Sequence, residues 1–301
     1  MKLLAFGEIL WDIIHGEEHL GGAPFNFAAH STQCGNEAYI VSRLGTDRLG
    51  LKAFQMCIRA GVNAQLIQWD DQFPTGVVDV TLKDGQPDYV IRQNAAYDFI
   101  EFDEKTRNVN AYDFDVFYFG SLAQRNSVSF NTLHSILKTL VVKYIFYDVN
   151  LRKTANHINT VRNSVSVCNV LKLNTDEASV ISEMLCGRAL AYEQFCNTLS
   201  ELHPNLQTII ITAAENGCYV FHRKILQHIP GIPVKIEDAI GAGDAFSAVF
   251  MKVYSETQDC LLSGRIANEV GAYVASKRGA IPQYSQRIKR LLAQTFLRSM
   301  E

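Results

Sequence analysis

The sequence predicts an α/β fold in which helices cover both faces of a mostly parallel sheet. Short runs of β-branched or aromatic residues recur along the 301-residue chain, and stretches of helical length separate most of them. These runs are hydrophobic throughout rather than at alternate positions, which is typical of strands buried on both faces. One segment, residues 74–92, breaks this rhythm and predicts a small antiparallel sheet beside the main one.

Six hydrophobic runs are the expected strands of the main sheet. They are KLLAFG (2–7), AYIVSRLG (38–45), VFYFGS (116–121), YIFYDVN (144–150), VLKLN (170–174) and TIIIT (208–212). The amphipathic stretches between them predict helices at residues 24–34, 47–60, 127–140 and 176–185. Pro24 suits a first helical turn, and Gly35 and Gly61 suit helix ends.

Residues 74–92 alternate apolar and polar side chains around a turn at Lys83, Asp84 and Gly85. This pattern is typical of a hairpin with one dry face and one wet face. With the segment near residue 12 it predicts a small antiparallel sheet, and an isolated hairpin is only marginally stable in water. We therefore expect a single domain over residues 1–301, with a lid from about residues 12–22 and 73–98 that is covered by a substrate, a partner subunit or both.

The composition limits the classes of function. Of the residues, 48% are hydrophobic and 20% are charged, and the net charge of −3 gives no basic excess for nucleic acid binding. No uninterrupted apolar run is long enough to span a membrane. The N-terminal run is short and contains Glu8 and Asp12, so it predicts a buried first strand rather than a signal peptide. The locally basic stretch at residues 286–298 predicts a surface helix.

The seven cysteines are odd in number and form no C-x-x-C pair. A disulfide framework or a zinc site is therefore not expected. Reduced thiols in a cytoplasmic protein fit this pattern best.

The stretch DAIGAGDAFSAVF, residues 238–250, predicts a site for an anion. Gly241 and Gly243 permit close backbone approaches, so loop amides and the first N–H groups of the following helix can point to one place. Asp244 beside such a site can accept the proton of an attacking hydroxyl, as phosphoryl transfer to an alcohol requires. Equally, Asp244 could only cap the helix. Phe246 excludes the dinucleotide fingerprint, and the lack of any Gly-Lys pair excludes a P-loop.

Several further motifs share one order along the chain with this stretch. They are GEILWD (7–12), LGGAPFNFA (20–28), VSRLGTDRLG (41–50), DVNLR (148–152), LKLNTDEA (171–178), IITAAENG (210–217), DAIGAGDAF (238–246) and RIANEVGAYVASKRGAIP (265–282). Their order and spacing resemble the ribokinase-like, or PfkB, family of carbohydrate kinases. The opening motifs are most similar to its bacterial fructokinase branch, and the resemblance covers nearly the whole chain.

This resemblance implies a ribokinase-like three-layer α/β/α fold with a small antiparallel β lid, and an ATP-dependent sugar kinase. The opening motifs favour fructokinase activity, which converts D-fructose and ATP to D-fructose 6-phosphate and ADP. The alternatives are ribokinase-type activity and 2-keto-3-deoxygluconate kinase, for which Arg92 or Arg152 could bind the substrate carboxylate. A catalytically silent binding relative is less favoured, because Asp244 and the glycines before it are present.

The resemblance also implies roles in catalysis and sugar binding. The matching residues are Asp244 as catalytic base; Gly241, Ala242 and Gly243 as anion hole; and Asp12, Gly22, Asn26 and Arg152 as substrate-binding positions. Arg152 either contacts a substrate oxygen or phosphate or pairs with a carboxylate at the sheet edge. From the residues alone, Asp12 could be a turn former and Asn26 a helix-surface amide.

A second set of residues matches the family's nucleotide and cation positions. They are Asn174, Thr212, Gly217 and Asn268 for ATP, Glu177 for Mg²⁺ through water, and Asp238 and Ile240 for a monovalent cation such as K⁺. Asn174 and Glu177 could instead be ordinary helix-start residues. The chain departs from the family pattern at Ala239, where Thr is usual, and at Ala214, where Gly is usual. The expected partners are a sugar, MgATP and a second copy bound through the lid, with no nucleic acid and no membrane.

Overall fold

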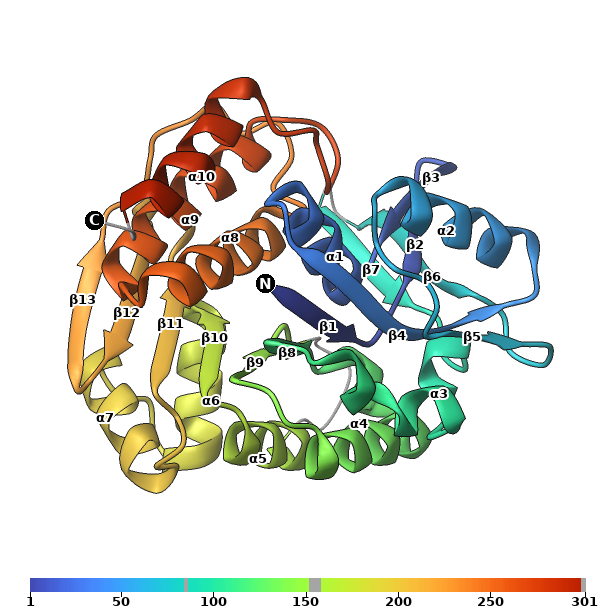
Figure 1. Ribbon diagram of the computed structural model, residues 1–301, viewed down its shortest axis with the longest axis horizontal. Helices are drawn as coiled ribbons and strands as arrows, with labels where there is room; N and C mark the ends of the chain where they lie inside the picture. Colours follow the sequence, from blue (N-terminus) through green and yellow to red (C-terminus); the bar gives the residue numbers. More distant parts are fainter. Residues whose placement is uncertain (84–85, 152–157, 299–301) are drawn as a thin grey trace.

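The computed structural model describes residues 1–83, 86–151 and 158–298. These residues form a nine-stranded sheet between two layers of helices, so the predicted three-layer α/β/α architecture is confirmed (Figure 1). The strands of this sheet are β1 (Lys2–Phe6), β4 (Glu37–Gly45), β5 (Ile67–Asp70), β8 (Val116–Phe119), β9 (Tyr144–Asp148), β10 (Val170–Asn174), β11 (Thr208–Thr212), β12 (Cys218–His222) and β13 (Ile225–Ile229).

The order across the sheet is β13-β12-β11-β10-β9-β8-β1-β4-β5. The strands from β11 to β5 are parallel, whereas β12 and β13 pair antiparallel at one edge. The carboxyl ends of the parallel strands therefore meet along one edge of the sheet, where α/β folds usually place their ligand sites.

Each helix predicted from the sequence begins and ends within one residue of its expected position. The α-helices of the described residues are α1 (Ala23–Gln33), α2 (Arg48–Arg59), α3 (Glu104–Arg107), α4 (Ser127–Thr139), α5 (Ile158–Val167), α6 (Thr175–Cys186), α7 (Tyr192–Leu202), α8 (Ala242–Thr257), α9 (Cys260–Ala275) and α10 (Gln286–Arg298). Side-chain caps fix several starts: Asp47 accepts from Gly50 N at 2.8 Å, and Asn126 accepts from Val128 N at 3.0 Å. In Figure 1, α1, α8, α9 and α10 lie on one side of the strands and α4 to α7 on the other.

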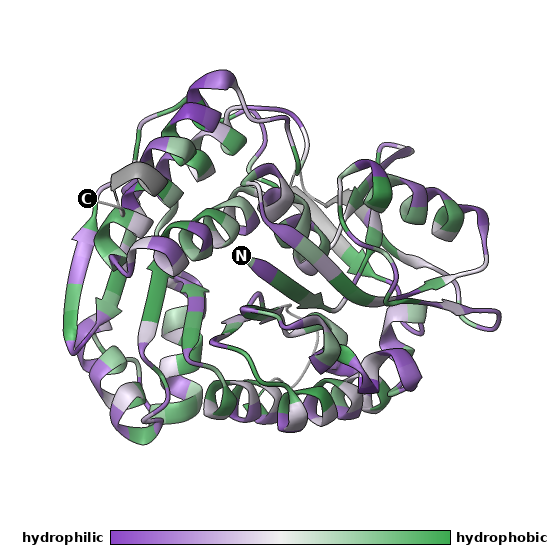
Figure 2. Cartoon of the chain, in the orientation of Figure 1, coloured by the Kyte–Doolittle hydropathy of each residue, from purple (hydrophilic) through white to green (hydrophobic). Residues whose placement is uncertain are grey.

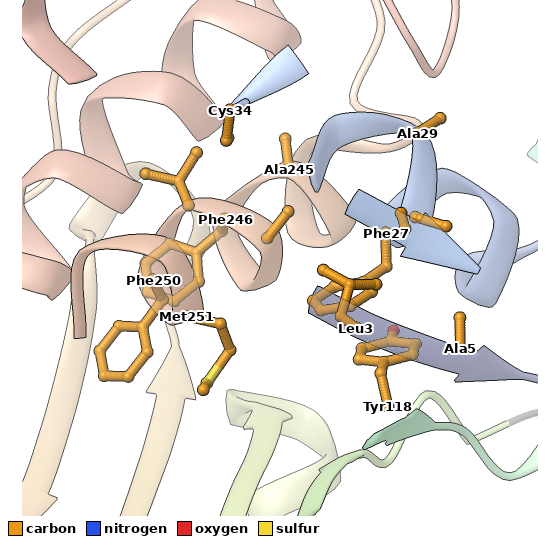
Figure 3. Packing of buried hydrophobic residues seen from close by; sticks show 14 of the residues in the cluster. Leu3, Ala5, Phe27, Ala29, Cys34, Tyr118, Ala245, Phe246, Phe250 and Met251 are labelled. Atoms are coloured by element: carbon orange, nitrogen blue, oxygen red, sulfur yellow. The ribbon is translucent and has the colours of Figure 1, made fainter. Parts of the chain in front are cut away.

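The two faces of β1 contribute to two separate hydrophobic clusters. Leu3 and Ala5 pack with residues of α1, α8 and α9, whereas Leu4 and Phe6 pack with residues of α4 to α7. Figure 3 shows the first cluster, in which Phe27 stacks on Tyr118 with ring centroids 3.9 Å apart. Burial on both faces explains why these strands are hydrophobic throughout, and much of β1 and β11 is green in Figure 2.

A second, four-stranded sheet has the order β3-β2-β6-β7, from β2 (Leu10–Ile14), β3 (Glu17–Gly21), β6 (Gly76–Lys83) and β7 (Gln86–Ile91). The β2–β3 and β6–β7 pairs are antiparallel, and the central β2–β6 pair is parallel. The predicted small sheet and its hairpin are therefore present, although residues 84–85 of the expected turn lie outside the described residues. The N-terminal run forms two strands rather than one, because the chain leaves the large sheet after Phe6 and enters the small sheet at Leu10.

The small sheet is attached to α2. Trp11 Nε1 donates to the Leu49 carbonyl at 3.1 Å, and the Lys52 ammonium lies 4.5 Å from the Trp11 ring centroid. Lys52 also pairs with Glu18 of β3 at 2.8 Å. The Trp11 side chain is fully buried, so it packs β2 against the body of the protein rather than offering a platform to a ligand.

All seven cysteines are unpaired, and only Cys186 is not buried. Burial raises the pKa of Cys57 and Cys196 to about 12 and that of Cys260 to about 11, so these thiols stay protonated and unreactive at neutral pH.

We therefore expect a thiol reagent to modify only Cys186 rapidly in the native protein and all seven cysteines after denaturation without reductant. The measurement is a colorimetric thiol titration followed by mass spectrometry. Fewer than seven thiols in the denatured protein would indicate a disulfide and contradict this prediction.

Candidate active site

Two cavities open where the parallel strands end. The first has a volume of about 340 Å³ and lies between β2, the start of α1 and the start of α8. The second has a volume of about 600 Å³ and is lined largely by residues of α8, α9 and the segment 231–236. Asn174, Thr212 and Gly243 line both cavities. The two cavities therefore meet at the first turn of α8.

The start of α8 requires glycine. Gly241 precedes the first helical residue with φ 79°, in the left-handed region that favours glycine. A β-carbon at Gly241 would lie 2.2 Å from the Ala280 carbonyl oxygen, so another residue would force the backbone apart. Ala242 N donates to the Ala239 carbonyl at 3.3 Å, and Gly243 follows at the junction of the cavities. An anion there would meet the positive end of a 16-residue helix.

Asp244 lies in the first turn of α8 and lines the first cavity. Gly241 occupies the capping position, so the alternative that Asp244 caps the helix does not hold. Asn26 Nδ2 donates to Asp244 Oδ2 at 2.8 Å. This bond fixes the orientation of the carboxylate.

The sugar-binding candidates of the N-terminal region surround the same cavity. Asn26 is only 4% exposed, which excludes the helix-surface alternative, and Asp12 lies within β2 rather than in a turn. Gly22 follows the last residue of β3 and precedes α1 with φ 108°, and a β-carbon there would lie 2.4 Å from the Glu8 carbonyl oxygen. All three residues line the first cavity together with Asp244.

Asn174 and Glu177 form a capping box at the start of α6. Asn174 Oδ1 accepts from Glu177 N at 2.9 Å, and Glu177 Oε2 accepts from Asn174 N at 2.8 Å. Glu177 Oε1 also accepts from Leu151 N at 2.7 Å. Burial raises the pKa of the Glu177 carboxyl in spite of these bonds. Both residues therefore start a helix, and both side chains also line the first cavity, so the capping role and a role at the site are compatible.

A buried ion pair lies next to the first turn of α8. Lys172 Nζ donates to both carboxylate oxygens of Asp148, at 2.8 and 3.0 Å, and Asp148 also accepts from Tyr118 and Ser247. Burial alone would lower the pKa of Lys172, but the Asp148 carboxylate outweighs it and holds that pKa above its usual value. A β-carbon on Gly243 would lie 3.4 Å from Lys172 Nζ, so a charged ammonium is adjacent to the junction of the cavities.

The second cavity has mostly apolar walls. Thr212, Gly217 and Asn268 line it, together with Phe246 and several small or branched residues of α9 and the segment 231–236. Asn268 Nδ2 donates to the Ile229 and Pro230 carbonyls at 3.3 Å each, which holds β13 against α9. A β-carbon on Gly217 would lie 2.1 Å from the Ile229 carbonyl oxygen, so glycine is required there.

The two departures from the family pattern lie beside these cavities. Ala214, where glycine is usual, has φ 46° in the left-handed region. Ala239 follows Asp238, whose two oxygens accept from Ile240 N at 3.0 Å and from Gly279 N at 3.1 Å. Across the described parts of the chain, no three His, Cys, Asp or Glu side chains lie close enough to hold a metal ion together.

Residues 3–287 match the sequence pattern of the "pfkB family carbohydrate kinase" family. The chain belongs to this family. It is a sugar phosphotransferase with the ribokinase-like fold. Within its described residues, no helix has both the length and the hydrophobicity required to cross a bilayer.

Several proteins named as fructokinases resemble the chain over nearly its whole length. It is 25% identical over 307 residues to "Probable fructokinase-5" of Arabidopsis thaliana, which covers 93% of each chain. A fructokinase of Xylella fastidiosa with bound ATP has a TM-score of 0.84 at 21% identity and covers 100% of this chain and 99% of its own. A fructokinase of Vibrio cholerae with bound fructose, ADP and calcium has a TM-score of 0.82 at 21% identity and covers 97% and 98%.

Two residues need separate comment: one that was predicted for the site of this PfkB kinase and one that was not. Arg152 lies outside the described residues, so its alternatives stay open. Lys172 was not expected at the site, although a lone lysine in the otherwise hydrophobic run VLKLN was a signal. Among the described residues that line the first cavity, Lys172 is the single cationic side chain, against the carboxylates of Glu8, Asp12, Asp148, Glu177 and Asp244.

Proposed function

We propose that this PfkB kinase is a fructokinase that transfers the γ-phosphoryl group of ATP to a hydroxyl of D-fructose. The observation that carries the proposal is the junction of the two cavities at Gly243, with Asp244 on the side of the first cavity. A sugar in the first cavity and a nucleotide in the second would bring hydroxyl and terminal phosphate together at the start of α8.

In this reaction the sugar oxygen bonds to the γ-phosphorus while the bond from that phosphorus to the bridging oxygen of ADP breaks. The hydroxyl proton passes to the Asp244 carboxylate, which Asn26 orients through its 2.8 Å bond. The backbone of residues 241–243 and the nearby ammonium of Lys172 stabilise the negative charge on the equatorial phosphoryl oxygens. Asp12, Gly22 and Asn26 hold the sugar in this proposal.

Asn174, Thr212, Gly217 and Asn268 would contact ATP, and Glu177 would hold Mg²⁺ through water. Each Glu177 oxygen accepts one backbone N–H, which leaves acceptor capacity on the carboxylate for metal-bound water. When bound, Mg²⁺ neutralises charge on the phosphate oxygens. Asp238 and Ile240 are the candidates for K⁺, which would be held mainly by backbone carbonyls; each Asp238 oxygen accepts one amide, from Ile240 N or from Gly279 N.

The charge of the first cavity supports a neutral sugar as the acceptor. Its described lining carries several carboxylates, and its single ammonium, on Lys172, is paired with Asp148. Arg92, one candidate partner for an acid sugar, is paired with Asp79 through two bonds of 2.7 and 2.8 Å. A sugar carboxylate would meet like charge here, which disfavours 2-keto-3-deoxygluconate. The names of the relatives support fructose among neutral sugars.

The test is coupled ADP release with a panel of fructose, ribose, tagatose, 2-keto-3-deoxygluconate and nucleosides. We expect the highest kcat/KM with fructose and the lowest with 2-keto-3-deoxygluconate. Reactions without sugar and reactions without enzyme control for background hydrolysis of ATP. A higher kcat/KM with the acid sugar would contradict the argument from charge, and a higher value with ribose or a nucleoside would replace fructose within the same chemistry.

The small sheet would act as a lid and as a dimer interface. The hairpin of β6 and β7 carries an exposed apolar residue, Val90, which is 52% exposed in the single chain. We expect a homodimer through this sheet, measured by multi-angle light scattering at high micromolar concentration. Val90→Asp should shift the mass toward that of a monomer, whereas Val141→Asp, at an 83% exposed site far along the sequence, should not. A monomeric wild-type protein would contradict this expectation.

The seven unpaired thiols support a reducing, cytoplasmic location for this kinase.

A further inference from the structure

His30 is a fully buried polar residue one helical turn after Asn26 on α1. Residues four apart lie on the same helix face, so the side chain that orients Asp244 and the His30 imidazole point into the same region. The His30 ring makes two bonds: Nε2 lies 2.9 Å from the Ala280 carbonyl oxygen, and Nδ1 lies 2.9 Å from the Tyr284 hydroxyl.

These contacts define the protonation state of the imidazole. Burial lowers the pKa of His30 to about 4, so the ring is neutral at physiological pH and carries one N–H. A carbonyl oxygen can only accept, which places the proton on Nε2. Nδ1 then accepts from the Tyr284 hydroxyl, and this bond holds the ring in the tautomer that can donate to Ala280.

The Ala280 carbonyl is in contact with the anion site. Its oxygen would lie 2.2 Å from a β-carbon on Gly241, so residue 280 packs directly on the residue that precedes α8. Ala280 belongs to the connection between α9 and α10, residues 276–285, which has neither helix nor strand. Such a segment depends on side chains to fix its backbone, because it has no regular ladder of hydrogen bonds.

The α9–α10 connection is held from two sides. On the side of α1, Gln33 bonds to the Pro282 carbonyl at 3.2 Å and to Tyr284 N at 2.8 Å, in addition to the His30 bond. On the side of the glycine loop, Asp238 accepts from Gly279 N at 3.1 Å. His30 is thus the contact from α1 that lies opposite Gly241 itself.

We propose that His30 is a positioning residue for phosphoryl transfer: its Nε2–H fixes the Ala280 carbonyl against Gly241 and thereby sets the start of α8. Helix α1 then positions both parts of the site, the carboxylate of Asp244 through Asn26 and the backbone of the anion hole through His30. The inference rests on the proposed kinase function, and it assigns no contact between His30 and substrate.

The test compares substitutions that keep or remove the donor. His30→Leu removes both bonds and is expected to lower kcat by about 10- to 100-fold with little change in KM for the sugar, because small displacements at a reacting centre have effects of this size. His30→Gln keeps an N–H near the position of Nε2 and should recover most of kcat. Tyr284→Phe leaves the imidazole in place but removes the bond to Nδ1 that favours the tautomer with its proton on Nε2, so we expect a smaller loss of kcat.

Thr32→Val is the matched control on the same helix. Thr32 Oγ1 donates to the Ala29 and Ala60 carbonyls at 2.8 and 2.7 Å, on the side of α1 that faces the end of α2. This variant should lower the melting temperature and leave kcat unchanged. Wild-type kcat in His30→Leu overturns the inference. Equal losses of kcat in His30→Leu and His30→Gln also overturn it, because packing rather than the donor would then be responsible.

Hydrogen exchange separates this inference from the proposed function, since it needs no turnover. We expect the amides of residues 241–244 to exchange faster in His30→Leu than in Thr32→Val. If the wild-type protein phosphorylates no sugar in the panel, the proposed function fails, and the exchange result alone decides the structural role of His30. Unchanged exchange at residues 241–244 in His30→Leu overturns the inference, whichever sugar is the substrate.

Discussion

Asp244→Asn is expected to lower kcat for sugar phosphorylation by about 10²- to 10⁴-fold, the usual contribution of a general base. The substituted amide has nearly the shape of the carboxylate, and its oxygen can still accept the bond from Asn26. It cannot take the hydroxyl proton as the sugar attacks. ATP binding should persist, because Asp244 lines the first cavity and is absent from the lining of the second.

Steady-state kinetics with the preferred sugar gives kcat, and calorimetric titration with an ATP analogue gives the affinity for nucleotide. Asp259→Asn is the matched control, since it makes the same chemical change at the cap of α9, away from both cavities. It should leave kcat near the wild-type value. An Asp244→Asn variant with more than about a tenth of wild-type kcat would remove Asp244 as the base, because a general base contributes far more than that.

Lys172→Met is expected to lower the free energy of unfolding by about 3–5 kcal/mol, the range measured when one partner of a buried ion pair is removed. Asp148 would keep its bonds from Tyr118 and Ser247 but lose the neutralising ammonium. The Lys172 and Asp148 side chains are only 9% and 2% exposed, so water cannot solvate the unpaired Asp148 carboxylate. Denaturation by urea, monitored by circular dichroism, measures the change.

A double-mutant cycle isolates the interaction. Adding Asp148→Asn to Lys172→Met removes the unpaired charge and should restore part of the lost stability. Arg92→Met is the surface comparison, because its pair with Asp79 is 60% and 36% exposed and should contribute at most about 1 kcal/mol. If the two losses in the cycle simply add, then Lys172 and Asp148 do not stabilise each other.

Much of the fold could be predicted because its determinants are local. A strand buried on both faces is hydrophobic at nearly every position, and this made β1, β8 and β11 visible as nearly unbroken runs. The pairing of β2 with β6 is different in kind. These strands are more than sixty residues apart in the chain, and their parallel register, Leu10 beside Gly76, is set by the tertiary packing of the small sheet.

The candidate site divides in the same way. Gly241 and Asp244 were predictable because a left-handed glycine before a helix and an acidic first turn are written in consecutive residues. Lys172 was not, because its role depends on the register that places it beside Asp148 on the neighbouring strand. His30 was hidden for a similar reason: its partners, Ala280 and Tyr284, are about 250 residues away.

Asp12 belongs to the small sheet, whereas Asn26 and Asp244 belong to helices on the large sheet, and all three line one cavity. A carbohydrate bonded to all of them would join the two sheets, so its arrival would favour the compact arrangement over any more open one. Without carbohydrate nothing favours the compact arrangement. Water could then reach the terminal phosphate more easily, but the groups that promote its attack would not be correctly positioned. The protein would thereby limit wasteful consumption of nucleotide when no carbohydrate is available.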